Sequence, residues 1–298
     1  MNDSGMLVGG RYLLGDVIGR GGMGVIHVAS GQHDGNTYAV KLLRAADGAD
    51  SMARRRFARE ASNALRISHP NAVRTFAVGE QADYAWMAME FVNGCSLHRW
   101  IEQNGRCEPH TAAVWIAQLA DVLAHVHLLG IVHRDVKPSN VMISGAELRL
   151  LDFGLARDMD NAAHVITRDG RAAGTPGFMA PEQRLGLPPS ARADVFSLAA
   201  LAAFLLAGRM PVAAWAKPLE TRMFGRRRRW PDVVDEILTR ALAPDPMTRT
   251  ATTVEFSDAF AQAVKQPGWS ERVPLVHWRR EQQLSAGSGE TFTPSTEM

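Results

Sequence analysis

The sequence predicts an α+β fold with two lobes: a small antiparallel β lobe that carries one helix, and a larger, mainly helical lobe. Short β-type runs separated by turn clusters occupy residues 11–92, whereas helical periodicity dominates from residue 95 onward. The length of 298 residues and the hydrophobic share of 46% are sufficient for one large domain or for two lobes.

Five β-type runs and one helix account for the small lobe. The helix is expected at Ser51–Ile67, because its apolar residues recur at the spacing of a single helix face, with Glu60 beside that face. Turn clusters such as His33–Asn36 separate the β-type runs. The expected strands are Tyr12–Ile18, Val25–Ala29, Thr37–Leu43, Ala72–Val78 and Trp86–Phe91.

The larger lobe is expected to surround a central helix. Asp194–Ala207 is apolar on nearly every side, which is typical of a helix buried in a core. Further helices are expected at Thr111–Leu129, Val233–Ala243 and Thr253–Val264. Pro, Gly, Ser and Thr are frequent in residues 265–298, which are therefore expected to form a largely disordered tail.

Composition and charge argue against several classes of protein. The 33 basic and 31 acidic residues leave a net charge of +2, which favours no particular partner. Cys95 and Cys107 form no CxxC pair, which argues against a disulfide framework or a structural zinc site. The N-terminus lacks a secretory-signal pattern, and the longest apolar run, Leu198–Ala207, is too short to span a bilayer. We therefore expect a cytoplasmic protein without a membrane span.

The first motif with chemical content is glycine-rich. Gly19, Gly21 and Gly24 form a GxGxxG pattern between two expected strands, and glycine lets the backbone approach phosphate oxygens closely. A strand follows this pattern instead of a helix, which argues against a dinucleotide-binding turn. The next expected strand carries Lys41, which can hold phosphate oxygens as a point charge if a carboxylate such as Glu60 orients it.

The run from His133 to Asn140, His-Arg-Asp-Val-Lys-Pro-Ser-Asn, is a far more specific signal. Asp135 can accept a proton from a hydroxyl group, and Lys137 can neutralise a transferring phosphoryl group. The side-chain carbonyl of Asn140 can bind a hard cation.

Two further motifs follow this run. Val141–Leu151 is expected to form a hairpin around Gly145, which would return Asp152 to the neighbourhood of Asn140 and so create a pair of Mg²⁺ ligands. Ala180-Pro181-Glu182 then closes a long loop segment, residues 155–179, and a loop of that length in a compact protein is usually functional.

These motifs, in this order, resemble the signature set of protein kinases. The Gly-Gly-Met-Gly form of the loop and the His133–Asn140 run resemble bacterial Hanks-type serine/threonine kinases in particular. The resemblance covers about residues 11–264. It implies a protein-kinase-like fold with an N-lobe at 11–91 that carries one regulatory helix, a C-lobe at 92–264, and a tail at 265–298.

The resemblance also implies an activity. Such an enzyme transfers the γ-phosphoryl group of ATP, bound with Mg²⁺ or Mn²⁺, to serine or threonine hydroxyls of protein substrates. The stretch Met89–Val92 resembles the hinge that reads the adenine edge, with Met89 as gatekeeper. The implied nucleotide-binding residues are Ile18, Gly19, Gly21, Gly24, Ile26, Ala39, Lys41, Met89, Glu90, Val92 and Met142.

Catalytic roles carry over from the same resemblance. Asp135 is implied as the catalytic base, with Lys137 and Thr175 beside it, and Lys41 is implied to pair with Glu60. Asn140 and Asp152 are implied as the Mg²⁺ ligands. Arg134 and Thr167 are implied as regulatory residues, the arginine pairing with a phosphorylated Thr167. Fold roles are also implied for three residues: Glu182 and Arg249 form an ion pair, and Asp194 caps backbone amides.

Other functions fit parts of the sequence. A pseudokinase that holds nucleotide or partners without turnover would keep the same motifs, and a kinase of small molecules would share most of them. Arg226–Arg229 could meet nucleic acid or anionic lipid, although a solvated face or a docking site for acidic substrates is the simpler interpretation, so no nucleic-acid partner is expected. A transient homodimer is compatible with autophosphorylation in trans.

Overall fold

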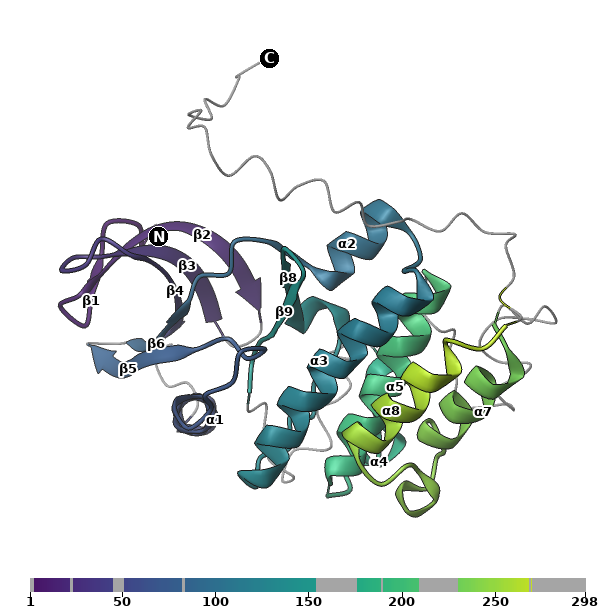
Figure 1. Cartoon of the computed structure of the whole chain (residues 1–298). Coiled ribbons are helices and arrows are strands. Elements are labelled where there is room, and N and C mark those ends of the chain that lie inside the picture. Colours follow the sequence, from purple (N-terminus) through teal and green to yellow (C-terminus); the bar gives the residue numbers. More distant parts are fainter. Residues whose placement is uncertain are drawn as a thin grey trace, which may run out of the picture.

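The computed structural model describes residues 3–21, 24–44, 51–81, 84–153, 176–188, 190–208, 230–267 and 269. Within these ranges the chain forms a β lobe with one helix and a larger helical lobe, which lie side by side in Figure 1. The two-lobed α+β architecture predicted from the sequence is therefore present.

The small lobe is built on a six-stranded antiparallel sheet with the order β1-β2-β3-β4-β6-β5. Helix α1, Ser51–Leu65, packs its buried face against one side of this sheet. A separate cluster centred on Tyr12 and Trp86 covers the other side. The strands are β1 (Leu7–Val8), β2 (Tyr12–Gly21), β3 (Gly24–Gly31), β4 (Thr37–Arg44), β5 (Thr75–Gln81) and β6 (Tyr84–Glu90).

Two features of this sheet differ from the sequence-based expectation. Strand β1 precedes the expected start of the domain at residue 11, and a strand of two residues leaves no alternation to detect. The strand expected at Ala72–Val78 begins only at Thr75. Ala72 instead forms an isolated parallel bridge with Leu150 of the large lobe, which removes it from the strand.

The large lobe surrounds helix α5, Ala191–Ala207, in which every residue from Ala193 to Ala207 is buried. The prediction of a central buried helix is confirmed. The other helices are α2 (Leu97–Asn104), α3 (Pro109–Leu128), α4 (Pro181–Arg184), α7 (Asp232–Ala241) and α8 (Thr253–Ala263). Helix α2 was not expected from the sequence.

A three-stranded sheet of β7 (Cys95–Ser96), β8 (Val141–Ser144) and β9 (Glu147–Leu150) lies where the two lobes meet. Strands β8 and β9 are the predicted hairpin, and Gly145 takes a positive φ of 61° at its turn. Single 3₁₀ turns occur at Pro138–Asn140, Pro176–Phe178 and Pro246–Thr248.

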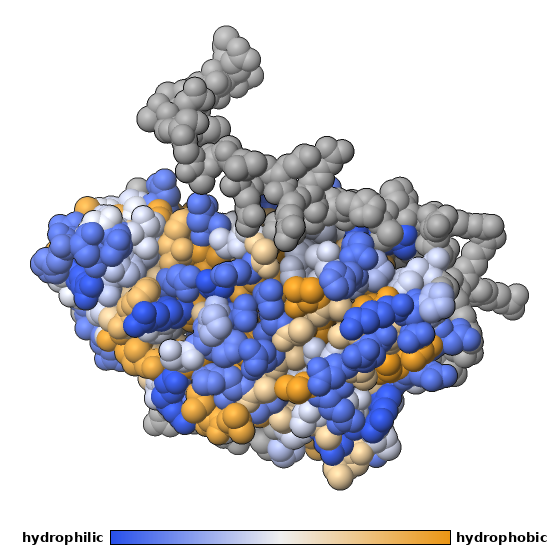
Figure 2. All heavy atoms as spheres, viewed as in Figure 1, coloured by the Kyte–Doolittle hydropathy of each residue, from blue (hydrophilic) through white to orange (hydrophobic). Residues whose placement is uncertain are grey.

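Among the described helices, only α3 is long and apolar enough to cross a membrane by length and composition. Half of its 18-residue window is buried inside the protein, and core helices of soluble proteins meet the same criterion. On the face shown in Figure 2, hydrophobic residues form separate patches among hydrophilic ones.

Candidate active site

A buried lysine connects the two lobes. Lys41 lies on β4 with 6% of its surface exposed. Its Nζ donates to Oε1 of Glu60 on α1 at 2.6 Å and to Oδ1 of Asp152, which follows β9, at 3.3 Å. The predicted pair of Lys41 with Glu60 is present, and Asp152 lies against the same amine.

Burial and charge act in opposite directions on this cluster. Burial alone would lower the pKa of Lys41, but the carboxylates of Asp152 and Glu60 raise it above the ordinary lysine value, so the amine stays protonated. Burial raises the pKa of Glu60, and the charge of Asp152 adds to that effect. Two carboxylates around one ammonium leave a net negative charge, which suits the approach of a divalent cation.

The carboxylate of Asp135 is held by two side chains that follow it in the sequence. Lys137 Nζ donates to Asp135 Oδ2 at 2.6 Å. Asn140 Nδ2 donates to the same oxygen and to the backbone carbonyl of Asp135, both at 2.9 Å. Because the amide nitrogen of Asn140 faces two acceptors, its carbonyl oxygen is turned away from Asp135 and can serve as a cation ligand.

The β8–β9 hairpin brings Asp152 next to Asn140, as predicted. The N–H of Leu151 donates to the carbonyl of Asn140 at 2.9 Å, so Asp152 lies one residue beyond a direct contact with Asn140. An amide oxygen and a carboxylate fit Mg²⁺, which is typically bound by one or two side chains together with water and substrate phosphates. No cluster of three or more His, Cys, Asp or Glu ligands occurs in the described part of the chain.

The backbone is strained at two positions of this site. Arg134 and Asp152 have φ values of 67° and 56°, in the left-handed region that costs a non-glycine residue about 1–2 kcal/mol. Asp194 at the start of α5 offsets the strain at Arg134, because its carboxylate accepts the N–H groups of His133 and Arg134, both at 2.8 Å. The predicted cap by Asp194 is present, and His127 Nε2 lies 2.7 Å from the same carboxylate.

Several predicted nucleotide-binding residues lie together on the side of the sheet that packs against α1. Ile26 on β3 lies opposite Lys41, and Ala39 on β4 lies opposite Met89 on β6. Ile26 and Val92 pack against the buried cluster that contains Ala39 and Met89. The backbone N–H and C=O of Val92 make no hydrogen bond with the described part of the protein, which leaves them able to read an adenine edge.

The glycines of the loop are not equivalent. Gly24 has a φ of 128°, and a Cβ there would lie 2.0 Å from the backbone oxygen of Leu42, so pairing of β3 with β4 requires glycine. Gly19 has no such φ, and its Cβ would lie 3.5 Å from Ile26 Cδ1, an ordinary contact. Gly21 pairs with Gly24 at the end of the β2–β3 ladder. Gly24 therefore serves the fold, while Gly19 is free to serve close approach of a ligand.

The remaining nucleotide-binding candidates are less buried. Ile18 on β2 is 50% exposed, and Met142 on β8 is partly buried. The carboxylate of Glu90 accepts from Arg149 Nε on β9 at 3.4 Å and from the N–H of Arg74 at 3.3 Å. The side chain of this hinge residue therefore ties the hinge to the large lobe, which sequence reasoning did not foresee.

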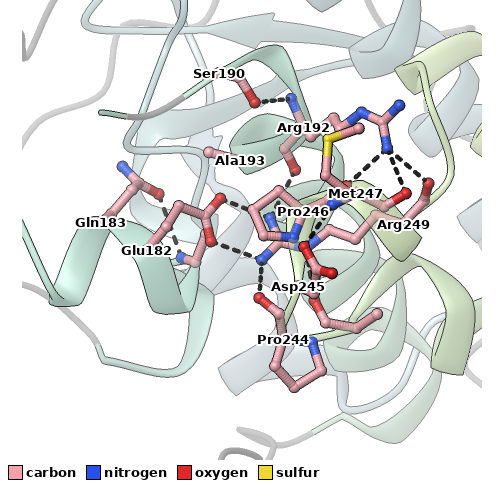
Figure 3. A network of polar contacts seen from close by, with 12 residues as sticks. Glu182, Gln183, Ser190, Arg192, Ala193, Pro244, Asp245, Pro246, Met247 and Arg249 are labelled. Atoms are coloured by element: carbon pink, nitrogen blue, oxygen red, sulfur yellow. Dashed lines mark hydrogen bonds and ion pairs between the residues drawn. The ribbon is translucent and has the colours of Figure 1, made fainter. Parts of the chain in front are cut away.

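The predicted buried ion pair between Glu182 and Arg249 is present, and Figure 3 shows the two side chains facing each other. Arg249 Nη1 and Nη2 donate to Glu182 Oε1 and Oε2 at 2.7 and 2.6 Å. Arg249 also donates to the carbonyls of Arg192, Ala243 and Pro244. Its side chain is fully buried, so this pair anchors α4 to the core of the large lobe.

Several predicted residues lie outside the described residues. These are Thr167, Thr175, Arg226–Arg229, and most of the long loop segment at 155–179. The predicted contacts of Thr175 with Asp135 and Lys137, and of Arg134 with a phosphorylated Thr167, stay predictions.

Two polar side chains that support the site were missed. Gln183 Nε2 donates to the carbonyl of Arg134 at 2.9 Å, and Ser197 Oγ donates to the carbonyl of Phe178 at 2.7 Å. A signal was available for both: Gln183 directly follows the Ala180–Glu182 motif, and Ser197 lies nearly one turn after Asp194 on α5.

The fold and this set of charged residues are those of a protein kinase domain. A family model described as "Protein kinase domain" matches residues 12–262, so the chain belongs to the protein kinase family. The predicted resemblance and the predicted kinase fold are confirmed.

Curated relatives and solved structures agree. The chain is 33% identical over 273 residues to the probable serine/threonine-protein kinase PknB of Bifidobacterium longum, covering 84% of this chain and 39% of that protein. It is 34% identical to serine/threonine-protein kinase PkaA of Streptomyces coelicolor, covering 81% and 48%. The crystal structure of the Mycobacterium tuberculosis PknI kinase domain matches with a TM-score of 0.70 and 28% identity, covering 87% of this chain and 98% of that chain. The chain thus spans less than half the length of these two curated relatives.

Proposed function

We propose that this chain is an active serine/threonine protein kinase that transfers the γ-phosphoryl group of Mg-ATP to protein hydroxyls. The observation that carries the proposal is the convergence of Lys41, Glu60 and Asp152 from three separate elements, with contacts of 2.6 and 3.3 Å. Two carboxylates around one buried lysine leave an excess negative charge, and a divalent cation bound to a triphosphate complements this arrangement.

The residues of the chain divide the work of phosphoryl transfer. Lys41 would hold the α- and β-phosphates while Glu60 fixes its position, and Asn140 and Asp152 would hold Mg²⁺, which supplies neutralisation of phosphate charge. Asp135 would orient the acceptor hydroxyl and receive its proton. Lys137, which already contacts Asp135 at 2.6 Å, would shift toward the transferring phosphoryl group.

The acceptor class follows from resemblance and from relatives. Lys137 stands two residues after the proposed base, as in serine/threonine kinases, and the relatives named above are serine/threonine-protein kinases. We extend the proposal to cytoplasmic location, to autophosphorylation at Thr167 through a transient homodimer, and to pairing of that phosphate with Arg134.

The test is incubation of the protein with labelled ATP, Mg²⁺ and casein as acceptor, followed by mapping of phosphosites. Lys41→Met and Asp152→Asn should abolish incorporation, and Asp135→Asn should lower it by about 10²–10⁴-fold. Lys265→Met makes the same substitution at an exposed lysine and should leave turnover unchanged. Wild-type protein that shifts its melting temperature with Mg-ATP but incorporates no phosphate would be a pseudokinase, and the proposal would be wrong.

A further inference from the structure

The strained backbone just before Asp135 is held on two sides. Arg134 has a left-handed φ of 67°, and its N–H donates to Asp194 at 2.8 Å. Its carbonyl, which belongs to the peptide group that leads into Asp135, accepts Gln183 Nε2 at 2.9 Å. Both polar atoms of Arg134's backbone are therefore held, one from α5 and one from α4.

Gln183 is fixed at both ends of its amide. While Nε2 donates to Arg134, Oε1 accepts the N–H of Ala180 at 3.3 Å. The two partners require opposite amide atoms, so they determine which way the amide faces. Gln183 is partly buried, and the side chain has little freedom to release Arg134.

Helix α4 gives this contact a rigid base. Glu182, the residue before Gln183, forms the two-point ion pair with Arg249 in the core of the large lobe, and Figure 3 shows Glu182 and Gln183 as neighbours on this helix. The main-chain bonds from Gln183, Arg184 and Leu185 back to the preceding turn complete the helix. The position of the Gln183 amide is therefore set by a buried anchor and not by an exposed loop.

We propose that Gln183 is a positioning residue for catalysis, which holds the Arg134–Asp135 peptide so that the Asp135 carboxylate faces the acceptor hydroxyl. Lys137 and Asn140 restrain the carboxylate itself. The N–H of the Arg134–Asp135 peptide donates to His133 Nδ1 within the same loop at 3.3 Å, and Gln183 holds the carbonyl of that peptide from outside the loop. This inference rests on the proposed function. It adds that α4 controls the geometry of the proposed base.

Two substitutions separate this role from simple support of α4. Gln183→Glu keeps an oxygen for the Ala180 N–H but cannot donate to the Arg134 carbonyl when ionised. Gln183→Met has a similar length and loses both bonds. Gln262→Met on α8, an exposed glutamine, is the matched control.

Steady-state kinetics with casein and Mg-ATP should show a fall in kcat of about two- to tenfold for both Gln183 variants. This is the loss expected when one neutral hydrogen bond no longer stabilises the transition state. KM for ATP should stay within about twofold, because the contacts of Lys41 are untouched. Gln262→Met should match wild type. If Gln183→Glu keeps wild-type kcat while Gln183→Met does not, Gln183 supports only the helix and the inference is wrong.

Hydrogen exchange of the nucleotide-free proteins provides a readout independent of turnover. The amide hydrogens of a peptide covering residues 131–137 should exchange faster than in wild type in both Gln183 variants, and at the wild-type rate in Gln262→Met. Inactive wild-type protein would contradict the proposed function, whereas unchanged exchange in this peptide would contradict the inference about Gln183.

Discussion

Replacing Glu182 with glutamine should destabilise the protein by about 3–5 kcal/mol, because it leaves a buried guanidinium without its counter-charge. Arg249 directs each of its N–H groups at an acceptor: two at Glu182, and the others at the carbonyls of Arg192, Ala243 and Pro244. Glutamine keeps the shape of the side chain but turns an NH₂ group toward a guanidinium donor. The charge is lost, and one buried donor is left without an acceptor.

The loss should be visible by heat and by denaturant. For a domain of this size, 1 kcal/mol corresponds to about 2–4 °C in Tm, so Glu182→Gln should lower Tm by about 6–20 °C. Urea unfolding followed by circular dichroism gives the free energy directly, provided that the m-value is unchanged.

A matched substitution tests whether burial is the cause. Glu147 also pairs with an arginine, Arg149, at 2.9 Å, but its side chain is 64% exposed. Glu147→Gln should therefore cost less than about 1 kcal/mol. Equal losses for Glu182→Gln and Glu147→Gln would refute the reasoning, because water reaches the side chain of Glu147 but not the buried pair of Glu182 and Arg249.

Three other predictions follow from the geometry. Gly24→Ala should lower both Tm and ATP affinity, since the added Cβ would lie 2.0 Å from the backbone oxygen of Leu42. Gly19→Ala should weaken ATP binding without changing Tm, so equal Tm values for the two variants would contradict this prediction. Arg149→Met releases the hinge glutamate and should raise KM for ATP by about two- to tenfold with kcat retained, measured by steady-state kinetics. Burial raises the pKa of the Cys107 thiol, so less of its reactive thiolate forms at pH 8. Iodoacetamide should therefore label the half-buried Cys95 first and Cys107 only in denaturant, and equal labelling rates in the native protein would contradict this.

Most of the site was predictable because its residues occur in compact motifs. Lys41, Asp135, Asn140 and Asp152 each belong to a short pattern whose chemistry is legible from residue type and spacing. The hairpin around Gly145 could also be read, since alternating residues flank a glycine that takes positive φ. Local sequence patterns were sufficient to predict a residue's role wherever local structure determines where its side chain lies.

The rest depended on contacts between distant segments. Gln183 is next to a recognisable motif, but it is 49 residues from Arg134, and nothing in either segment indicates that the two residues are in contact. Ala72 lies in a run with β-type composition, yet its bridge to Leu150 belongs to the other lobe. The strain at Arg134 could not be foreseen either, because a positive φ at arginine is imposed by Asp194 and Gln183 and not by the residue itself.

The side-chain amide of Asn140, the proposed metal ligand, is hydrogen-bonded to Asp135, the proposed base, so the position of each residue depends on the other. Since both of its hydrogens bond Asp135, a change at either residue disturbs the other. Kinetic losses from single substitutions at these two positions therefore overlap, and a double-mutant cycle should show strong non-additivity. Any number obtained from Asp135→Asn alone would measure the shared unit of base and metal ligand, not proton transfer in isolation.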